Sequence, residues 1–121
     1  QYAHARVCSV LRKLESEGMN WDQSAGLAAL ERLDTEAERD LVTALGKYPE
    51  TLQNSAHNFE PHLLANYLRD LASDFHTYYN GHKMLIDDVQ LRNARITLSV
   101  AVRQVLANGL QLLGVSAPEQ M

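Results

Sequence analysis

The sequence contains little of what marks several protein classes. Cys8 is its single cysteine, which excludes an internal disulfide. Six glycines and three prolines in 121 residues are too few for a collagen-like or low-complexity chain. No apolar run approaches the ~20 residues that span a bilayer, and no signal peptide opens the chain, so we expect no membrane partner. A lone thiol is typical of the reducing cytoplasm, which is the expected location.

Size and composition predict one compact domain. The 121 residues are 45% hydrophobic and 21% charged, enough for a single apolar core. The chain opens with Gln1 rather than methionine, and the helical pattern is already under way there. We therefore expect residues 1–121 to be one domain of a longer protein.

Charge is unevenly distributed along the chain. The total of 11 Lys+Arg against 15 Asp+Glu argues against indiscriminate binding to nucleic acid, DNA included. Residues 1–14 and 89–118 nevertheless carry Lys and Arg with no acid, whereas residues 15–40 are strongly acidic. If the first and last helices pack together, they form one positive surface on an acidic domain. The alternative is that ordinary solvated helix faces scatter charge in this way.

Helical periodicity pervades the sequence and predicts an all-α fold, a single bundle of four to five helices. Gly18 suits the left-handed end of a first helix, and the short segment 20–33 is a connector with a turn of helix. Thr35 to Glu38 reads as a capping box that opens a helix ended by Gly46.

Prolines and a C-terminal glycine delimit the later helices. Pro49 and Pro61 suit first-turn positions, and Asn80-Gly81 closes the helix that Pro61 opens. Asp87 or Asp88 is expected to cap a last helix from Val89 to about Leu113, with Gly114 as its stop. Apolar residues cover more than half of that last helix, so it should lie near the centre of the bundle.

No catalytic or metal site is apparent. The histidines lack the spacing of known metal motifs, since His57/His62 and His76/His82 merely straddle turns. Cys8 lies among apolar neighbours, where a thiol is usually inert. With no strands, no phosphate-binding loop between strand and helix is expected. We predict no catalytic residue, no metal and no cofactor within these residues.

Two polar stripes have the composition of nucleic-acid contacts. The first helix aligns Tyr2, Arg6, Ser9 and Lys13 on one face, and the last helix aligns Arg92, Arg95, Ser99 and Arg103. Guanidinium groups pair with phosphates, and tyrosine rings stack on unpaired bases. Solvated faces without function remain the alternative interpretation.

Four ordered motifs resemble the C-terminal anticodon-binding domain of bacterial arginyl-tRNA synthetases, the DALR family. They are Gln1–Arg6, His62–Asn80, Arg92–Leu110 and the closing Leu112–Met121. The resemblance spans nearly all of residues 1–121, with residues 19–60 the least diagnostic. Gln120 and Tyr78 depart from the family, which often has arginine and phenylalanine there.

The resemblance implies a class I synthetase, a cytoplasmic monomer that uses ATP and magnesium to attach arginine to its tRNA. The helical domain would bind the anticodon stem-loop, chiefly reading the central cytosine. The catalytic domain would lie upstream of Gln1, so this chain alone is expected not to aminoacylate.

The same resemblance suggests roles for individual residues. Tyr2 and Tyr79 would stack on splayed bases, and the arginines would contact phosphates or base edges. A carboxylate near the C-terminus would accept a hydrogen bond from the cytosine amino group. Asn108 and His76 are weaker candidates for RNA contact, and we expect them to support the fold instead. The predicted RNA-binding residues are Tyr2, Arg6, Tyr79, Arg92, Arg95, Glu119 and Met121.

Other readings stay open at this point. A helical protein-interaction module with no RNA role would use the arginine stripes to bind an acidic protein surface. A related synthetase, such as the cysteine enzyme, carries a similar domain, although the closing residues 114–121 argue against it. Selectivity for a base distinguishes these readings.

Overall fold

A computed structural model describes residues 2–116 of the chain. These residues fold into helices without a β-strand, which confirms the all-α prediction. Five helices have ten residues or more, and the connector adds the short α2 and a single 3-10 turn. The elements are α1 (Tyr2–Ser16), α2 (Gln23–Ala28), η1 (Leu30–Arg32), α3 (Glu36–Gly46), α4 (Tyr48–His57), α5 (Pro61–Gly81) and α6 (Val89–Ser116).

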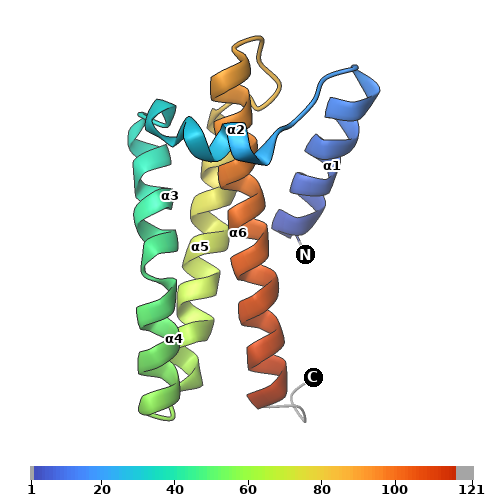
Figure 1. Ribbon diagram of the computed structural model, residues 1–121. Helices are drawn as coiled ribbons and strands as arrows, with labels where there is room; N and C mark the ends of the chain where they lie inside the picture. Colours follow the sequence, from blue (N-terminus) through green and yellow to red (C-terminus); the bar gives the residue numbers. More distant parts are fainter. Residues whose placement is uncertain (1, 117–121) are drawn as a thin grey trace.

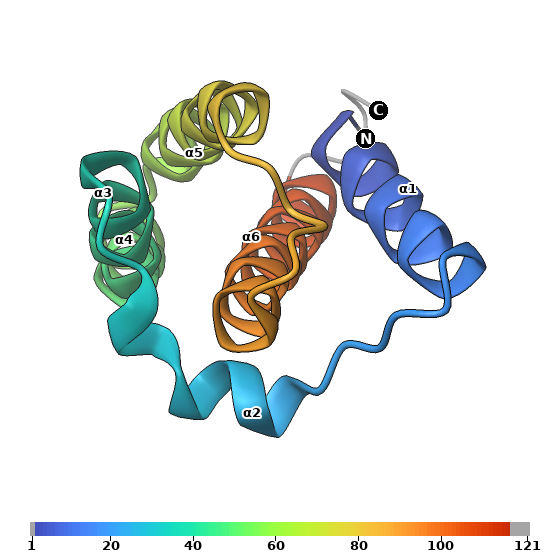
Figure 2. The ribbon, with the colours of Figure 1, turned by 90° about the horizontal axis from the view of Figure 1, so that it is seen from above.

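Helix α6 lies at the centre of the bundle, as its apolar circumference predicts. Seen from above, α1 lies on one side of it, α3 and α4 on the other, and α2 and α5 close the ring (Figure 2). Helix α6 contacts α1, α2, α3, α5 and η1. Its central position buries Ala94, Ile96 and Val102 completely.

The hydropathy of α6 differs from one expectation drawn from the sequence. Within Val89–Gly114 an 18-residue window reaches a mean hydropathy of 1.3, so α6 is long and apolar enough to cross a membrane by length and composition alone. The expectation from the sequence is that no apolar run approaches the ~20 residues that span a bilayer. Its packing against five other elements gives this apolarity an explanation, since a helix surrounded by others is apolar on most sides.

Local signals place most helix ends correctly. The capping box is present, because the Thr35 hydroxyl accepts the Glu38 amide proton and the Glu38 carboxylate accepts the Thr35 amide proton, both at 3.2 Å. At the start of α6, the Asp88 carboxylate accepts from the Leu91 amide at 3.3 Å. The predicted stop at Gly114 is wrong, because α6 continues to Ser116. A glycine permits a helix end but does not impose one.

Helix α2 crosses α6 at very close range (Figure 1). Gly26 lies directly against the backbone of Asn93 and the side chain of Thr97. Trp21 Nε1 donates to Thr97 Oγ1 at 3.0 Å, and the Asp22 amide donates to Asn93 Oδ1 at 3.2 Å. These bonds explain why α6 buries the polar side chains of Asn93 and Thr97 where α2 crosses it.

Two helices end in the same motif with different residues. At the end of α1, the amides of Gly18 and Met19 donate to the carbonyls of Glu15 and Leu14, and Gly18 has φ 72°. At the end of α4, Phe59 has φ 55° and repeats this Schellman pattern, its amide and that of Glu60 donating to Ala56 and Ser55.

The Phe59 side chain does not offset its backbone strain. It is 91% exposed, and a left-handed conformation costs a non-glycine residue about 1 kcal/mol. We expect Phe59→Gly to raise the free energy of unfolding by about 0.5–1 kcal/mol, measured by urea denaturation. Gly18→Ala should lower it by a similar amount. A loss of stability in Phe59→Gly would show that the phenyl ring is held by contacts that its exposure does not suggest.

Candidate nucleic-acid interface

Helices α1 and α5 bring together two of the predicted RNA-binding residues. The guanidinium carbon of Arg6 lies 4.9 Å from the centre of the Tyr79 ring. The ring is half-buried and also packs against Phe75, with the ring centres 6.1 Å apart. A cation over an aromatic ring contributes about 0.5–1 kcal/mol at an accessible site. The pair presents a stacking surface and a positive charge at one place.

A small cavity lies beside this pair, and we call it the α1–α5 cleft. It has a volume of about 210 Å³. Its polar lining comes from Ser9 and Lys13 of α1, Tyr79 of α5, and His82 and Lys83 of the loop that follows. Ser9 and Lys13 belong to the stripe predicted on the first helix. Lys83 was missed, because a lysine in a short loop shows no periodicity that would align it with a helix face.

Arg92, predicted to contact RNA, is largely buried in the domain. The residue is only 8% exposed, and its Nη1 donates to the Ile86 carbonyl at 2.9 Å. Within residues 2–116, its Nε is buried without a hydrogen-bond partner. The loop between α5 and α6 folds over this side of the central helix. The guanidinium therefore holds that loop.

Arg95 also makes its contacts within the domain. Its side chain is only 13% exposed, and its Nε lies 2.8 Å from Oε2 of Glu38. Its Nη1 donates to the Lys83 carbonyl at 2.9 Å. Arg92 and Arg95 both bind groups within the domain. The positive surface predicted from the first and last helices is therefore limited to the side of α1. Arg103 stays half-buried, with Nη1 3.7 Å from the Cys8 sulfur.

Glu38 is the acid around which this interior is organised. It is completely buried, and its Oε2 accepts from the Tyr78 hydroxyl at 2.8 Å as well as from Arg95. Burial would raise the pKa of Glu38, but the hydrogen bonds from Tyr78, Thr35 and Arg95 outweigh it and lower the pKa. Burial, and then the bond to Glu38, raise the pKa of Tyr78. Glu38 is thus held ionised and paired.

The remaining predicted residues are only partly described. Tyr2 begins α1, one turn before Arg6, and its side chain lies outside the description. Glu119 and Met121 lie outside the described residues, so their contacts stay predictions. Asn108 accepts a hydrogen bond from the Tyr48 hydroxyl, in keeping with a scaffold role. His76 is half-buried on α5, and its Nε2 lies 3.3 Å from Nδ2 of Asn80.

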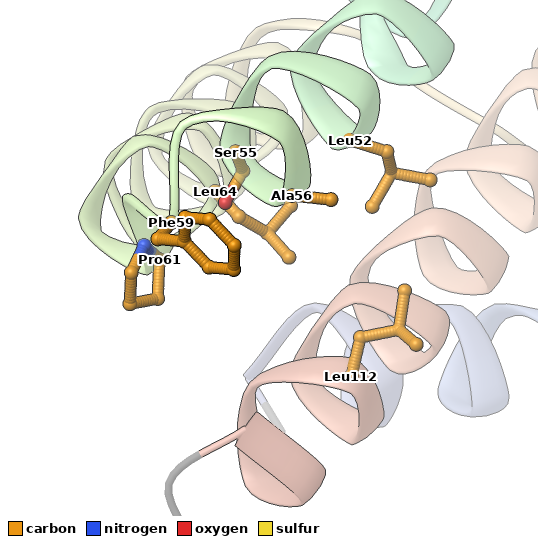
Figure 3. A pocket seen from close by; sticks show the side chains of 7 residues that line it. All are labelled: Leu52, Ser55, Ala56, Phe59, Pro61, Leu64 and Leu112. Atoms are coloured by element: carbon orange, nitrogen blue, oxygen red, sulfur yellow. The ribbon is translucent and has the colours of Figure 1, made fainter.

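A second cavity lies at the opposite end of the bundle. Figure 3 shows Phe59, Pro61 and Leu64 on one side of it and Leu112 of α6 on the other. Its volume is about 350 Å³, and none of the described residues that line it carries a charged side chain. Its one lining hydroxyl, that of Ser55, donates to the Glu60 carbonyl at 2.9 Å. This cavity lacks the charge that a nucleic-acid site requires.

No group of three or more His, Cys, Asp or Glu side chains among residues 2–116 is placed to hold a metal ion. What the described part of the chain offers at the cleft is an aromatic ring, cations and a hollow between two helices.

An all-α bundle with an aromatic ring and cations on one face has the features of a helical RNA-binding domain. The comparison with protein families agrees: residues 1–121 match the model described as the DALR anticodon binding domain. The chain belongs to this family. This confirms the resemblance found in the sequence.

The individual relatives are arginine–tRNA ligases. The chain is 54% identical over all 121 residues to the protein of that name from Coxiella burnetii (strain RSA 331 / Henzerling II). It is 57% identical to that of Halorhodospira halophila and 52% identical to that of Legionella pneumophila (strain Corby), each over the whole chain. The chain spans about a fifth (21%) of the length of each of these relatives. These matches do not favour a protein-interaction module or a cysteine enzyme.

Proposed function

We propose that this domain binds the anticodon stem-loop of arginine tRNA as part of an arginine–tRNA ligase. The observation that carries the proposal is the placement of Arg6 over the Tyr79 ring beside a cleft with two lysines. Unpaired loop bases are commonly recognised by stacking on aromatic rings, and cations neutralise the phosphates between them. The names of the relatives supply the identity of the tRNA.

The proposal extends to the whole protein. A ligase of this kind would activate arginine with ATP and magnesium in a catalytic domain outside these residues, as a monomer in the cytoplasm. The present residues would contribute recognition of the tRNA and no chemistry. The purified domain is therefore expected to show no arginine-dependent charging.

The test is a titration of the domain against two anticodon stem-loop hairpins at fixed low salt. One hairpin has cytosine at the central anticodon position, and the other has a substituted base there. Fluorescence anisotropy should show tighter binding of the cytosine hairpin. Equal binding would overturn base reading by this domain. No binding of either hairpin would overturn the proposal and favour the protein-interaction module.

Tyr79 provides the sharpest variant for this titration. Tyr79→Ala should weaken binding of the cytosine hairpin about tenfold, because one base–aromatic stack contributes about 1–3 kcal/mol. Tyr79→Phe keeps the ring and should bind within about twofold of the unchanged domain. If the phenylalanine variant loses as much affinity as the alanine variant, the hydroxyl rather than the ring makes the contact. The melting temperature of each variant shows whether the domain stays folded with the new side chain at this half-buried position.

A further inference from the structure

The start of α3 binds three separate points next to the α1–α5 cleft. The Glu38 carboxylate accepts from the hydroxyl of Tyr78, in the last turn of α5, at 2.8 Å, and from Nε of Arg95 in α6, also at 2.8 Å. The hydroxyl oxygen of Thr35, the N-cap of α3, lies 3.0 Å from Nε2 of His82. Helix α3 itself lies on the far side of α6 from α1, and none of its described residues lines the cleft (Figure 2).

The bond to Tyr78 determines which way Tyr79 points. Consecutive side chains of an α-helix are about 100° apart, so the rotation of α5 that brings the Tyr78 hydroxyl to Glu38 turns the next ring towards α1. There the Tyr79 ring centre lies 4.9 Å from the guanidinium carbon of Arg6. Tyr78 is only 1% exposed and Glu38 is completely buried, so water does not compete for their hydrogen bond.

The bonds to Arg95 and His82 hold the loop after α5 in the same way. Nη1 of Arg95 donates to the Lys83 carbonyl at 2.9 Å, while its Nε is bound by Glu38. His82 donates through Nδ1 to the Tyr78 carbonyl at 3.1 Å, since a carbonyl only accepts, and its Nε2 faces the hydroxyl at the start of α3. Both His82 and Lys83 line the cleft. One end of α3 therefore fixes the α5 side of the cleft.

Stability alone does not account for a charged group at this place. When a buried ion pair is replaced as a whole by apolar side chains of similar size, stability is often unchanged or raised, because desolvation of the two charges offsets their attraction. Burial also opposes the ionised form of Glu38, and its hydrogen bonds are what lower its pKa. Hydrogen bonds require a defined direction, which apolar contacts do not. The buried acid therefore selects one arrangement of the helices.

We propose that Glu38 is a positioning residue for the RNA interface. By binding Tyr78 and Arg95, it holds the end of α5 and the following loop so that Tyr79 and Lys83 lie beside α1. Glu38 is completely buried and contacts no RNA itself. The inference rests on the proposed anticodon binding, and it adds an acid on the opposite side of the bundle that determines whether the interface is formed.

Removal of single hydroxyl groups tests this role. Tyr78→Phe removes the bond to Glu38, whereas the control Tyr67→Phe removes a bond of 2.6 Å to the Ala44 carbonyl, which also joins α5 to α3 but about three turns away. Tyr78→Phe should bind the cytosine hairpin about three- to tenfold more weakly, because apparent affinity falls with the fraction of molecules in the binding arrangement. Tyr67→Phe should bind within about twofold of the unchanged domain. Equal weakening by both variants would overturn the proposal.

A combined variant replaces the whole network by apolar side chains of similar size. Glu38→Leu, Tyr78→Phe and Arg95→Met together remove one negative and one positive charge, so the net charge stays the same. Urea denaturation should show that the variant still unfolds cooperatively. It should bind the cytosine hairpin at least about tenfold more weakly, and unchanged affinity would overturn the proposal. If the variant does not fold, the comparison of the two single hydroxyl variants decides.

Nuclear magnetic resonance tests the arrangement without RNA. In the unchanged domain, nuclear Overhauser effects should join side-chain protons of Arg6 to ring protons of Tyr79, since the two groups are in contact. These signals should weaken in Tyr78→Phe and in the combined variant, and they should persist in Tyr67→Phe. A merely stabilising hydroxyl would leave them in place in all three, which would overturn the positioning role.

The outcomes separate this inference from the proposed function. If the unchanged domain binds neither hairpin, the proposed function falls, and loss of the Arg6–Tyr79 signals in Tyr78→Phe would still support positioning of this pair by Glu38. If the cytosine hairpin is preferred and Tyr78→Phe matches Tyr67→Phe in affinity and in these signals, anticodon binding stands and the positioning role is overturned.

Discussion

Gly26→Ala is expected to lower the free energy of unfolding by about 3 kcal/mol. A Cβ atom at this position would lie 2.0 Å from Oγ1 of Thr97 and 2.6 Å from the backbone oxygen of Asn93. The Thr97 side chain can rotate, but only by giving up the hydrogen bond from Trp21. The Asn93 carbonyl cannot move without displacing the central helix. Forcing extra volume into a packed interface typically costs about 1–3 kcal/mol, and α2 would have to separate from α6.

Urea denaturation followed by circular dichroism measures this effect, with Gly46→Ala as the matched control. A Cβ at Gly46 meets nothing within 4 Å, so alanine there should leave stability unchanged or raise it by up to about 1 kcal/mol. If both variants unfold at the same urea concentration, the close approach of α2 to α6 is wrong. Trp21 fluorescence gives a second readout, since its ring leaves Thr97 when α2 moves away.

Glu38→Ala is expected to cost about 3–5 kcal/mol, the loss typical when one partner of a buried ion pair is removed. The substitution leaves the guanidinium of Arg95 without its carboxylate and the buried Tyr78 hydroxyl without its acceptor. It also removes half of the capping box that opens α3. Glu36→Ala, in the exposed first turn of the same helix, is the control and should cost well under 1 kcal/mol.

The lowered pKa of Glu38 makes this contribution dependent on pH. A carboxyl group with a lowered folded-state pKa stabilises the fold fully above its ordinary value, here 4.5, and loses that contribution as pH falls through the folded-state pKa. The unchanged domain should therefore lose stability between pH 5 and about pH 3 more steeply than Glu38→Ala does. Asp88 also has a lowered pKa, chiefly through its hydrogen bond from Arg32, and that contribution is common to both proteins.

Parallel stability curves at pH 7 and pH 3 test this prediction. The gap between the unchanged domain and Glu38→Ala should narrow at pH 3. A gap of constant size would mean that packing of the side chain, rather than its charge, carries the stabilisation.

The two arginines of α6 show the limit of reading charge from sequence. Periodicity correctly predicted that α6 lies at the centre, and the spacing of Arg92 and Arg95 correctly placed them on one face. The interpretation of that face as a surface for RNA stays a prediction, but the structure buries most of both side chains, because a central helix has neighbours on its polar side too. Lys83, four residues after Tyr79, occupies the accessible position instead.

Features that depend on neighbouring residues could be predicted from the order of amino acids alone. The capping box at Thr35, the prolines that begin α4 and α5 and the left-handed Gly18 act within a few residues, so their effects are visible in the order of amino acids. The all-α class and the family follow from periodicity and motifs along the chain.

Which polar groups meet and which face solvent depends on the packing of the helices in three dimensions. The placement of Arg6 over Tyr79, the burial of Glu38 against Arg95 and the contact of Gly26 with α6 join residues far apart in the sequence. Such contacts depend on how helices cross and on which loop covers which face. Periodicity assigns a side chain to one face of its own helix, but the elements packed on that face determine whether it reaches a ligand.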